Sequence, residues 1–179
     1  TDSEGDTEEA GVKKSFSKDS TETQTVEVED GSIKGTALEM PAGALSIDTE
    51  LTIEQGEDIA DSLAIAELDL EGGEGALSVA GPSVVITSSE AQDANVPFKL
   101  AIPLGDGASL TTAVCENLIV IFKVSKASED GTVYLGIIPT ASLTITDEKV
   151  TFETINFGAF QAACAKIAIT EKVEKKTGI

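Results

Sequence analysis

From residue 24 onward, the dominant spacing of hydrophobic residues in this 179-residue sequence is every second position. Val26 and Val28 alternate with polar residues, and so do Leu51 and Ile53. The same spacing returns later in the chain at Phe98, Leu100, Ile102, Val150 and Phe152. Because successive side chains of a strand point to opposite faces of a sheet, this period predicts half-buried β-strands.

The segment from Leu118 to Val124 is apolar on both strand faces. It therefore predicts a central strand covered by a second sheet, as a sandwich supplies. Asp30-Gly31 and Asp130-Gly131 are hairpin-turn signals between such strands. We predict an all-β, immunoglobulin-like antiparallel β-sandwich, an interaction domain over residues 24–170.

Two segments have a composition that favours helix, Ile59–Leu70 and Ala159–Lys176. We expect the first to be a short helix or loop that leads into a strand at about Ala64–Leu70. In the second, apolar residues alternate: Ala163, Ala165, Ile167 and Ile169. This alternation predicts a final strand over Phe160–Thr170, followed by a polar C-terminal end at residues 171–179.

Residues 1–23 carry seven acids and three lysines, with only Val12 and Phe16 as large apolar side chains. Such a segment buries too little surface to offset the entropy of ordering, so we predict a flexible, disordered acidic tether. If it is ordered instead, we expect an added edge strand around Val12–Phe16. The tether is either the stalk of a mature exported protein or lipoprotein, or simply an arbitrary chain boundary.

The charge of the chain excludes several partners. There are 32 acidic residues against 12 basic ones, all lysines, and the formal net charge is −20. Nucleic acid and anionic membrane surfaces are both poor partners for such a chain. No uncharged apolar run reaches the length of about eighteen residues that a membrane-spanning helix needs, so we expect no membrane span.

The absence of histidine removes Ser-His-Asp and Cys-His catalysis and imidazole zinc sites. Paired-carboxylate chemistry remains formally available, but there is no Trp and there are only six Phe and one Tyr to line a cleft. We therefore expect no enzymatic activity. A carboxylate pair facing across a concave cleft would revive that hypothesis.

Clusters of acidic residues suggest a calcium site. The weak candidate ligands are Glu57, Asp58, Asp61, Asp69, Glu71 and Glu74. Calcium takes six to eight oxygen ligands, but no EF-hand or other ordered ligand spacing is present. We favour the alternative, a solvated acidic surface that maintains solubility, and expect no cofactor.

Cys115 and Cys164 are the two cysteines of the chain, and each lies beside a strongly apolar segment. In a cytosolic protein they would be buried free thiols, whereas in an exported chain they would form a disulfide. If they are bridged, we expect their Cα atoms to lie about 4.4 to 6.8 Å apart.

The stretch Leu38–Leu45 reads as a strand that stops at Pro41, turns through Gly43 and resumes as the alternating run Thr49–Glu54. Three further segments are considered with it: Gly81–Ile86, Val96–Leu104 and Val150–Gly158. Together they resemble the ZU-five domain, named after zonula occludens and the uncoordinated netrin receptors, and its relatives among bacterial surface proteins. The resemblance spans about residues 32–160 and implies a β-sandwich interaction module; it also favours the final strand.

Some ZU-five relatives cleave themselves at a His-Phe-Ser triplet near the end of the domain. The corresponding positions here are Asn156, Phe157 and Gly158. Gly158 has no nucleophile and Asn156 has no basic imidazole, so we expect an intact chain. We further expect Phe157 to pack into the core and Gly158 to permit a bend or a close backbone approach.

The most consistent interpretation is a non-enzymatic, protein-binding or adhesion-type module of an exported bacterial surface or periplasmic protein. Such a module would bind through its loops or an exposed sheet edge, and a lipid anchor upstream is compatible with it. The alternative is a calcium-dependent ligand- or carbohydrate-binding module that uses the acidic loops. The sequence does not identify the partner.

Overall fold

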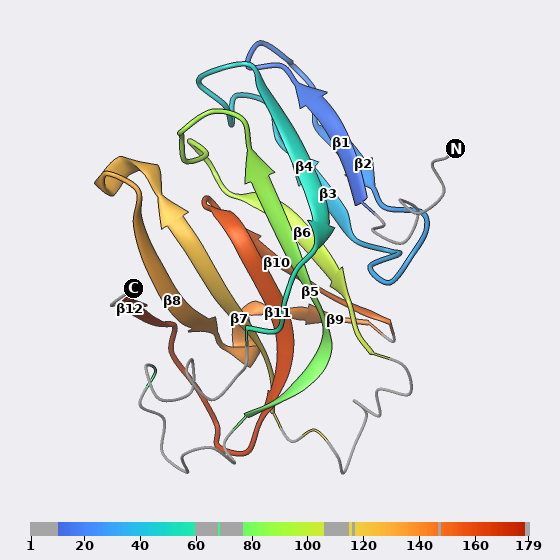
Figure 1. The fold of residues 1–179 in the computed structure, drawn as a ribbon, viewed down its shortest axis with the longest axis vertical. Coiled ribbons are helices and arrows are strands. Elements are labelled where there is room, and N and C mark those ends of the chain that lie inside the picture. Colours follow the sequence, from blue (N-terminus) through green and yellow to red (C-terminus); the bar gives the residue numbers. More distant parts are fainter. Residues whose placement is uncertain are drawn as a thin grey trace.

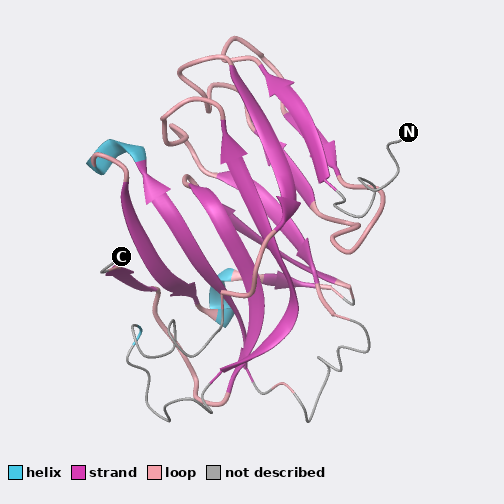
Figure 2. Ribbon diagram, in the orientation of Figure 1, coloured by secondary structure: helices cyan, strands magenta, loops and turns pink. Residues whose placement is uncertain are grey.

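The computed structural model describes residues 11–59, 68, 77–105, 115, 117–146 and 148–177. Its strands form two antiparallel sheets packed face to face (Figures 1 and 2). Helical structure in the named elements is limited to two 3₁₀ turns, η3 (Ala127–Glu129) and η4 (Thr140–Ser142). The predicted all-β sandwich is confirmed.

The larger sheet has seven strands in the order β1-β4-β5-β11-β7-β8-β12. Their bounds are β1 (Gly11–Phe16), β4 (Thr49–Gln55), β5 (Leu77–Ser88), β11 (Phe157–Ala165), β7 (Asn117–Lys126), β8 (Thr132–Ile138) and β12 (Val173–Lys176). Strands β1 and β12 form its two edges, so the first and last strands of the chain lie at opposite ends of one sheet (Figure 1).

The smaller sheet has five strands in the order β2-β3-β6-β10-β9. Their bounds are β2 (Gln24–Glu27), β3 (Ala37–Met40), β6 (Phe98–Pro103), β10 (Lys149–Thr154) and β9 (Thr144–Ile145). In Figure 1 strands β8 and β12 extend past this smaller sheet, so part of the inner face of the larger sheet forms an overhang.

The main core lies between the sheets, where the alternating apolar residues meet. Phe98 of β6 stacks on Phe157 of β11 with ring centroids 5.2 Å apart. Phe152 of β10 contacts Phe160 of β11 at 5.3 Å. Aromatic pairs bury large areas in this way, which explains how a chain with few aromatic residues closes its core.

A second apolar cluster explains why Leu118–Val124 is apolar on both faces. Leu118, Val120, Phe122 and Val124 belong to the core between the sheets. The alternate residues Ile119 and Ile121 point the other way and pack with Leu135, Ile137, Ile59, Leu68 and Ile169. The second sheet therefore covers one face of β7, and a smaller cluster covers the other.

The N-terminal tether prediction needs correction. Residues 11–16 form β1, which pairs with β4 from Gly11↔Glu54 to Phe16↔Thr49. Phe16 is only 1% exposed and belongs to the main core. The ordered strands therefore begin at Gly11 instead of residue 24, and β1 is the edge strand expected as the alternative to a tether. Residues 1–10 lie outside the described residues.

The C-terminal boundaries also differ from the prediction. The strand expected over Phe160–Thr170 is β11, which begins earlier, at Phe157, and ends at Ala165. The polar end predicted for residues 171–179 contains β12, which pairs with β8. Hydrogen bonds to β8 hold β12 as a strand, although the polar composition of this segment does not predict one. The strand expected at Ala64–Leu70 lies outside the described residues except for Leu68, so it stays a prediction.

Candidate functional site

The structure contains a disulfide between Cys115 and Cys164, whose Cα atoms lie 5.2 Å apart. Cys164 lies on β11 opposite Leu118 of β7, and Cys115 lies two residues before β7 begins. The bridge therefore fastens the start of β7 to the neighbouring strand. Neither cysteine is a free thiol.

Two of the six candidate calcium ligands are described, Glu57 and Asp58. The Asp58 carboxylate accepts a hydrogen bond from Gln161 Nε2 at 2.8 Å. Gln161 is fully buried, and its Oε1 accepts the backbone N–H of Ile59 at 2.7 Å. Asp58 thus helps to fasten the segment after β4 against β11.

Within the described ranges, no three Asp, Glu, His or Cys side chains come together in a group that could hold a metal ion. The other candidates, Asp61, Asp69, Glu71 and Glu74, lie outside the described residues. The calcium hypothesis therefore stays a prediction.

The segment Asn156–Gly158, for which a structural role is expected, packs tightly. Phe157 is buried against Phe98. A Cβ atom on Gly158 would lie 2.5 Å from the Lys123 carbonyl oxygen and 2.7 Å from Val124 Cα. Only glycine allows β11 to approach β7 this closely, because both obstructing atoms belong to the backbone.

Asn156 contributes to a polar cluster around Asp93. Its Nδ2 donates to Asp93 Oδ1 at 3.2 Å. The backbone N–H groups of Ala127 and Ser128 donate to the same carboxylate at 3.0 and 2.9 Å. Burial raises the pKa of Asp93, but the hydrogen bonds from Ser128, Ala127 and Asn156 outweigh it, so this pKa lies below its usual value. Asp93 therefore joins the loop before β6 to the η3 turn.

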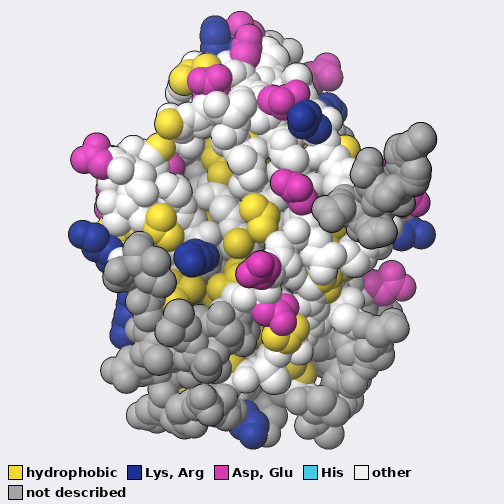
Figure 3. Space-filling model, viewed as in Figure 1, with side chains coloured by type: hydrophobic (Ala, Val, Ile, Leu, Met, Phe, Trp, Pro, Cys, Tyr) yellow, Lys and Arg dark blue, Asp and Glu magenta, His cyan; other side chains and the backbone are white. Residues whose placement is uncertain are grey.

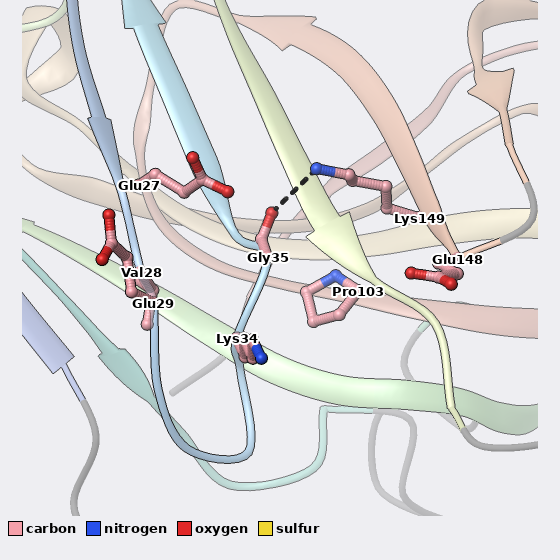
Figure 4. A pocket seen from close by; sticks show the side chains of 8 residues that line it. All are labelled: Glu27, Val28, Glu29, Lys34, Gly35, Pro103, Glu148 and Lys149. Carbon is pink, nitrogen blue, oxygen red and sulfur yellow. Dashed lines mark hydrogen bonds between the residues drawn. The ribbon is translucent and has the colours of Figure 1, made fainter.

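A pocket of about 590 Å³ lies at one end of the five-stranded sheet (Figure 4). Its lining includes three carboxylates and two ammonium groups: Glu27, Glu29, Glu148, Lys34 and Lys149. Lys149 Nζ reaches across it to donate to the Gly35 carbonyl at 3.3 Å. Its charges of both signs favour neither an anion nor a cation, so this pocket defines no ligand chemistry.

Strand β12 forms one edge of the larger sheet, and we term residues Lys172–Thr177 the C-terminal edge. The Thr177 N–H donates to the Val133 carbonyl at 3.0 Å. In an antiparallel pair the backbone groups of successive residues point alternately to the two sides, so Val173 and Lys175 also face β8. The N–H and C=O groups of Glu174 and Lys176 therefore face outward, and no strand within the described ranges pairs with them.

This edge is basic in a strongly acidic molecule. Five lysines lie on or beside it, on β7, β12 and the residue before β12: Lys123, Lys126, Lys172, Lys175 and Lys176. The nearby acids number four: Glu129, Asp130, Glu171 and Glu174. Lys126 Nζ contacts Glu174 Oε1 at 2.8 Å, and Tyr134 OH donates to Glu129 at 2.7 Å, a hydrogen bond that leaves the Glu129 charge in place. The five lysines thus outnumber the four acids by one. The local charge is therefore positive, while the chain as a whole carries −20.

A groove of about 320 Å³ adjoins the edge under the overhang. Phe122 and Ile138 line it from the larger sheet, and Ile155 lines it from the segment after β10. Lys172, 59% exposed, also lines the groove, with its Nζ 5.5 Å from the centre of the Phe122 ring. The groove and the C-terminal edge thus form one continuous surface.

The sequence prediction missed this surface because residues 171–179 read as a polar end. The available signal was the run of lysines in a chain whose charges are mostly acidic. Its position beside β8 could not be inferred, since the pairing joins segments about forty residues apart in sequence.

Comparison with models of known protein families and with curated proteins finds no match to this chain. The resemblance to ZU-five domains therefore stays a prediction. Over the described residues, no helix is long and apolar enough to cross a membrane.

Proposed function

We propose that this chain is a non-enzymatic, protein-binding module of an exported bacterial surface or periplasmic protein, and that its partner binds at the C-terminal edge. One observation carries the proposal. The outward backbone groups of Glu174 and Lys176 lie within a locally positive surface of a chain with net charge −20. Unpaired strand edges are common sites for protein partners.

The disulfide supports the extracytoplasmic part of the proposal. Disulfides persist in oxidising compartments and are rare in the cytosol, where thiols are kept reduced. The Cys115–Cys164 bridge therefore favours the periplasm or the cell surface. Figure 3 shows Asp and Glu side chains scattered over one face of the molecule, and the net charge of −20 favours solubility.

The other sheet edges are less suitable for a partner. Strand β9 has two residues. Strand β2 has four and bears an exposed glutamate, Glu27. Strand β1 is longer, but Lys13 shares its face with Glu50 and Glu54 of β4, and Lys14, on the other face, already donates to the Thr25 carbonyl of β2. The C-terminal edge combines backbone groups that no strand of the described residues pairs with and a local excess of lysines over acids.

A photocrosslinking experiment tests the location. A photoreactive amino acid replaces Lys175, which is exposed on β12, and in a matched variant it replaces Lys13, exposed on the opposite edge β1. After irradiation on cells of the source organism, we expect one discrete protein adduct from position 175 and none from position 13. Equal adducts from both positions, or none from position 175, would contradict the proposal.

A calcium titration tests the alternative function. A calcium site at about 100 times its Kd would add about 2.7 kcal/mol to stability, which is readily seen as a rise in melting temperature. We expect the melting temperature to be the same with calcium and with EDTA. A rise with calcium that EDTA reverses would instead support the calcium-dependent module.

A further inference from the structure

We infer that the partner presents an acidic, extended segment, which adds to β12 as an eighth strand of the larger sheet. This inference rests on the proposed function and specifies the chemistry of the partner at the same surface. It depends on three features of the C-terminal edge: its backbone, its charge and the faces on which its side chains lie.

The backbone accepts only an extended partner. Glu174 and Lys176 each present an N–H and a C=O toward the open side. Two residues separated by one position provide a repeat of donors and acceptors that a β-strand matches and a helix does not. A partner bound by charge alone would leave these groups to water.

The charges select an acidic segment. Lys172, Lys175 and Lys176 flank the free backbone groups, and the two C-terminal ones are exposed at the side chain. Glu174 lies between them, and its carboxylate is shared by Lys126 at 2.8 Å and Lys172 at 3.9 Å. Glu174 and Lys126 are both largely shielded, at 25% and 18% exposure, so Lys126 stays committed to Glu174. An incoming carboxylate therefore meets lysines that lack equally close compensation.

The lysines lie on both faces of the strand. Lys172 and Lys176 share the face of Glu174, toward the overhang groove, because side chains alternate along β12. Lys175 lies on the opposite face. A partner strand with carboxylates on both faces can thus reach lysines on both, while an apolar side chain near Lys172 can enter the groove beside Phe122.

A lysine-rich edge also discourages association between identical edges, and like charges repel there. That protection does not apply to an acidic strand, for which the same lysines are attractive. The edge thus rejects a second copy of itself and favours a partner of opposite charge.

The test uses a synthetic probe of about seven residues, rich in threonine and valine with two glutamates, and blocked at both ends. Binding to the full chain is followed through backbone amide NMR shifts. We expect saturable shifts centred on Glu174 and Lys176, with affinity falling as salt rises. Two altered probes accompany it, one with lysines replacing the glutamates and one with N-methylated backbone amides; neither should bind.

Matched variants separate the site from general charge. Lys175→Glu with Lys176→Glu should weaken probe binding by about tenfold or more. Lys13→Glu with Lys34→Glu changes the net charge by the same amount at exposed positions away from the edge and should leave binding unchanged. Equal weakening by both pairs would overturn the inference.

Other outcomes are equally decisive. Equal binding of the N-methylated probe would show attraction by charge without strand addition. Chemical shifts at β12 that depend only on the protein concentration would identify a second copy of the chain as the occupant. Either result would overturn the inference.

If the photocrosslink forms at position 175 but the acidic probe does not bind, strand addition is wrong and the proposed function stands. If the crosslink is absent, the proposed function fails whatever the probe does.

Discussion

Asp93 shows how one carboxylate can position three separate segments. It accepts hydrogen bonds from Ala127 and Ser128 in the η3 turn and from Asn156 just before β11. Charged hydrogen bonds of this kind contribute more to stability than neutral ones. Asn156 therefore has a structural role in this cluster.

We predict that Asp93→Asn destabilises the fold at neutral pH by about 1–2 kcal/mol, because it removes the charge that these donors stabilise. The pKa of Asp93 is lower in the folded state than its ordinary value of 3.8, so its contribution is present above that value. It is lost as the pH falls through the folded-state pKa. Urea unfolding at pH 7 and near pH 3 should show the gap between wild type and variant narrowing at low pH.

The exposed substitution Glu39→Gln provides the control, and it should have little effect at either pH. A gap of the same size at both pH values would mean that the charge of Asp93 does not stabilise the turn.

At the scale of elements, strand β1 is the clearest difference between the sequence prediction and the structure. Phe16 is buried in the core, while Lys13, Lys14 and Ser15 are exposed. We predict that Phe16→Ala destabilises the protein by about 3–5 kcal/mol, as expected for an aromatic residue removed from a core. Equilibrium urea unfolding measures the loss.

Ser15→Ala, on the same strand but exposed, should change stability by no more than about 0.5 kcal/mol. If Phe16→Ala has as small an effect as this control, β1 is not part of the cooperative fold and the tether prediction is correct after all.

The interior strands could be predicted from the sequence because their apolar residues alternate. Phe98, Leu100 and Ile102 fall within β6, and Val150 and Phe152 within β10. Each has enough buried side chains to define the pattern by itself. The short edge strands do not: β1 buries one large residue, and β12 has one apolar residue, Val173. Their order comes from hydrogen bonds to β4 and β8, which local composition does not reveal.

The candidate site could not be predicted for the same reason. Lys172, Lys175 and Lys176 are visible in the sequence as a charged end, but the pairing of β12 with β8 gives them a common edge. Asp58 illustrates the converse. Its acidic neighbours suggested a calcium ligand, whereas its partner, Gln161, lies more than a hundred positions away in the chain.

For the whole molecule, the disulfide contributes to stability by restricting the unfolded chain. The two cysteines are separated by 49 positions, for which the chain-entropy relation gives about 4 kcal/mol. We predict that Cys115→Ala with Cys164→Ala loses about this much in urea unfolding.

A reducing agent should destabilise the wild type by a similar amount and leave the double variant unchanged. Thiol titration of the denatured, unreduced wild type should detect no free thiols. Two titratable thiols would show that the bridge does not form in the purified protein.

The placement of β1 and β12 at opposite edges of one sheet determines how the molecule would respond to tension. A force applied between Gly11 and Thr177 acts largely across the strands, so it peels the edge strands away one hydrogen bond after another instead of shearing many at once. The centre of the sheet behaves differently, because the Cys115–Cys164 bridge prevents the chain between these two residues from extending. Under tension, the two edge strands would thus detach first, including the edge proposed to bind the partner. The disulfide would then limit how far the rest of the chain can extend.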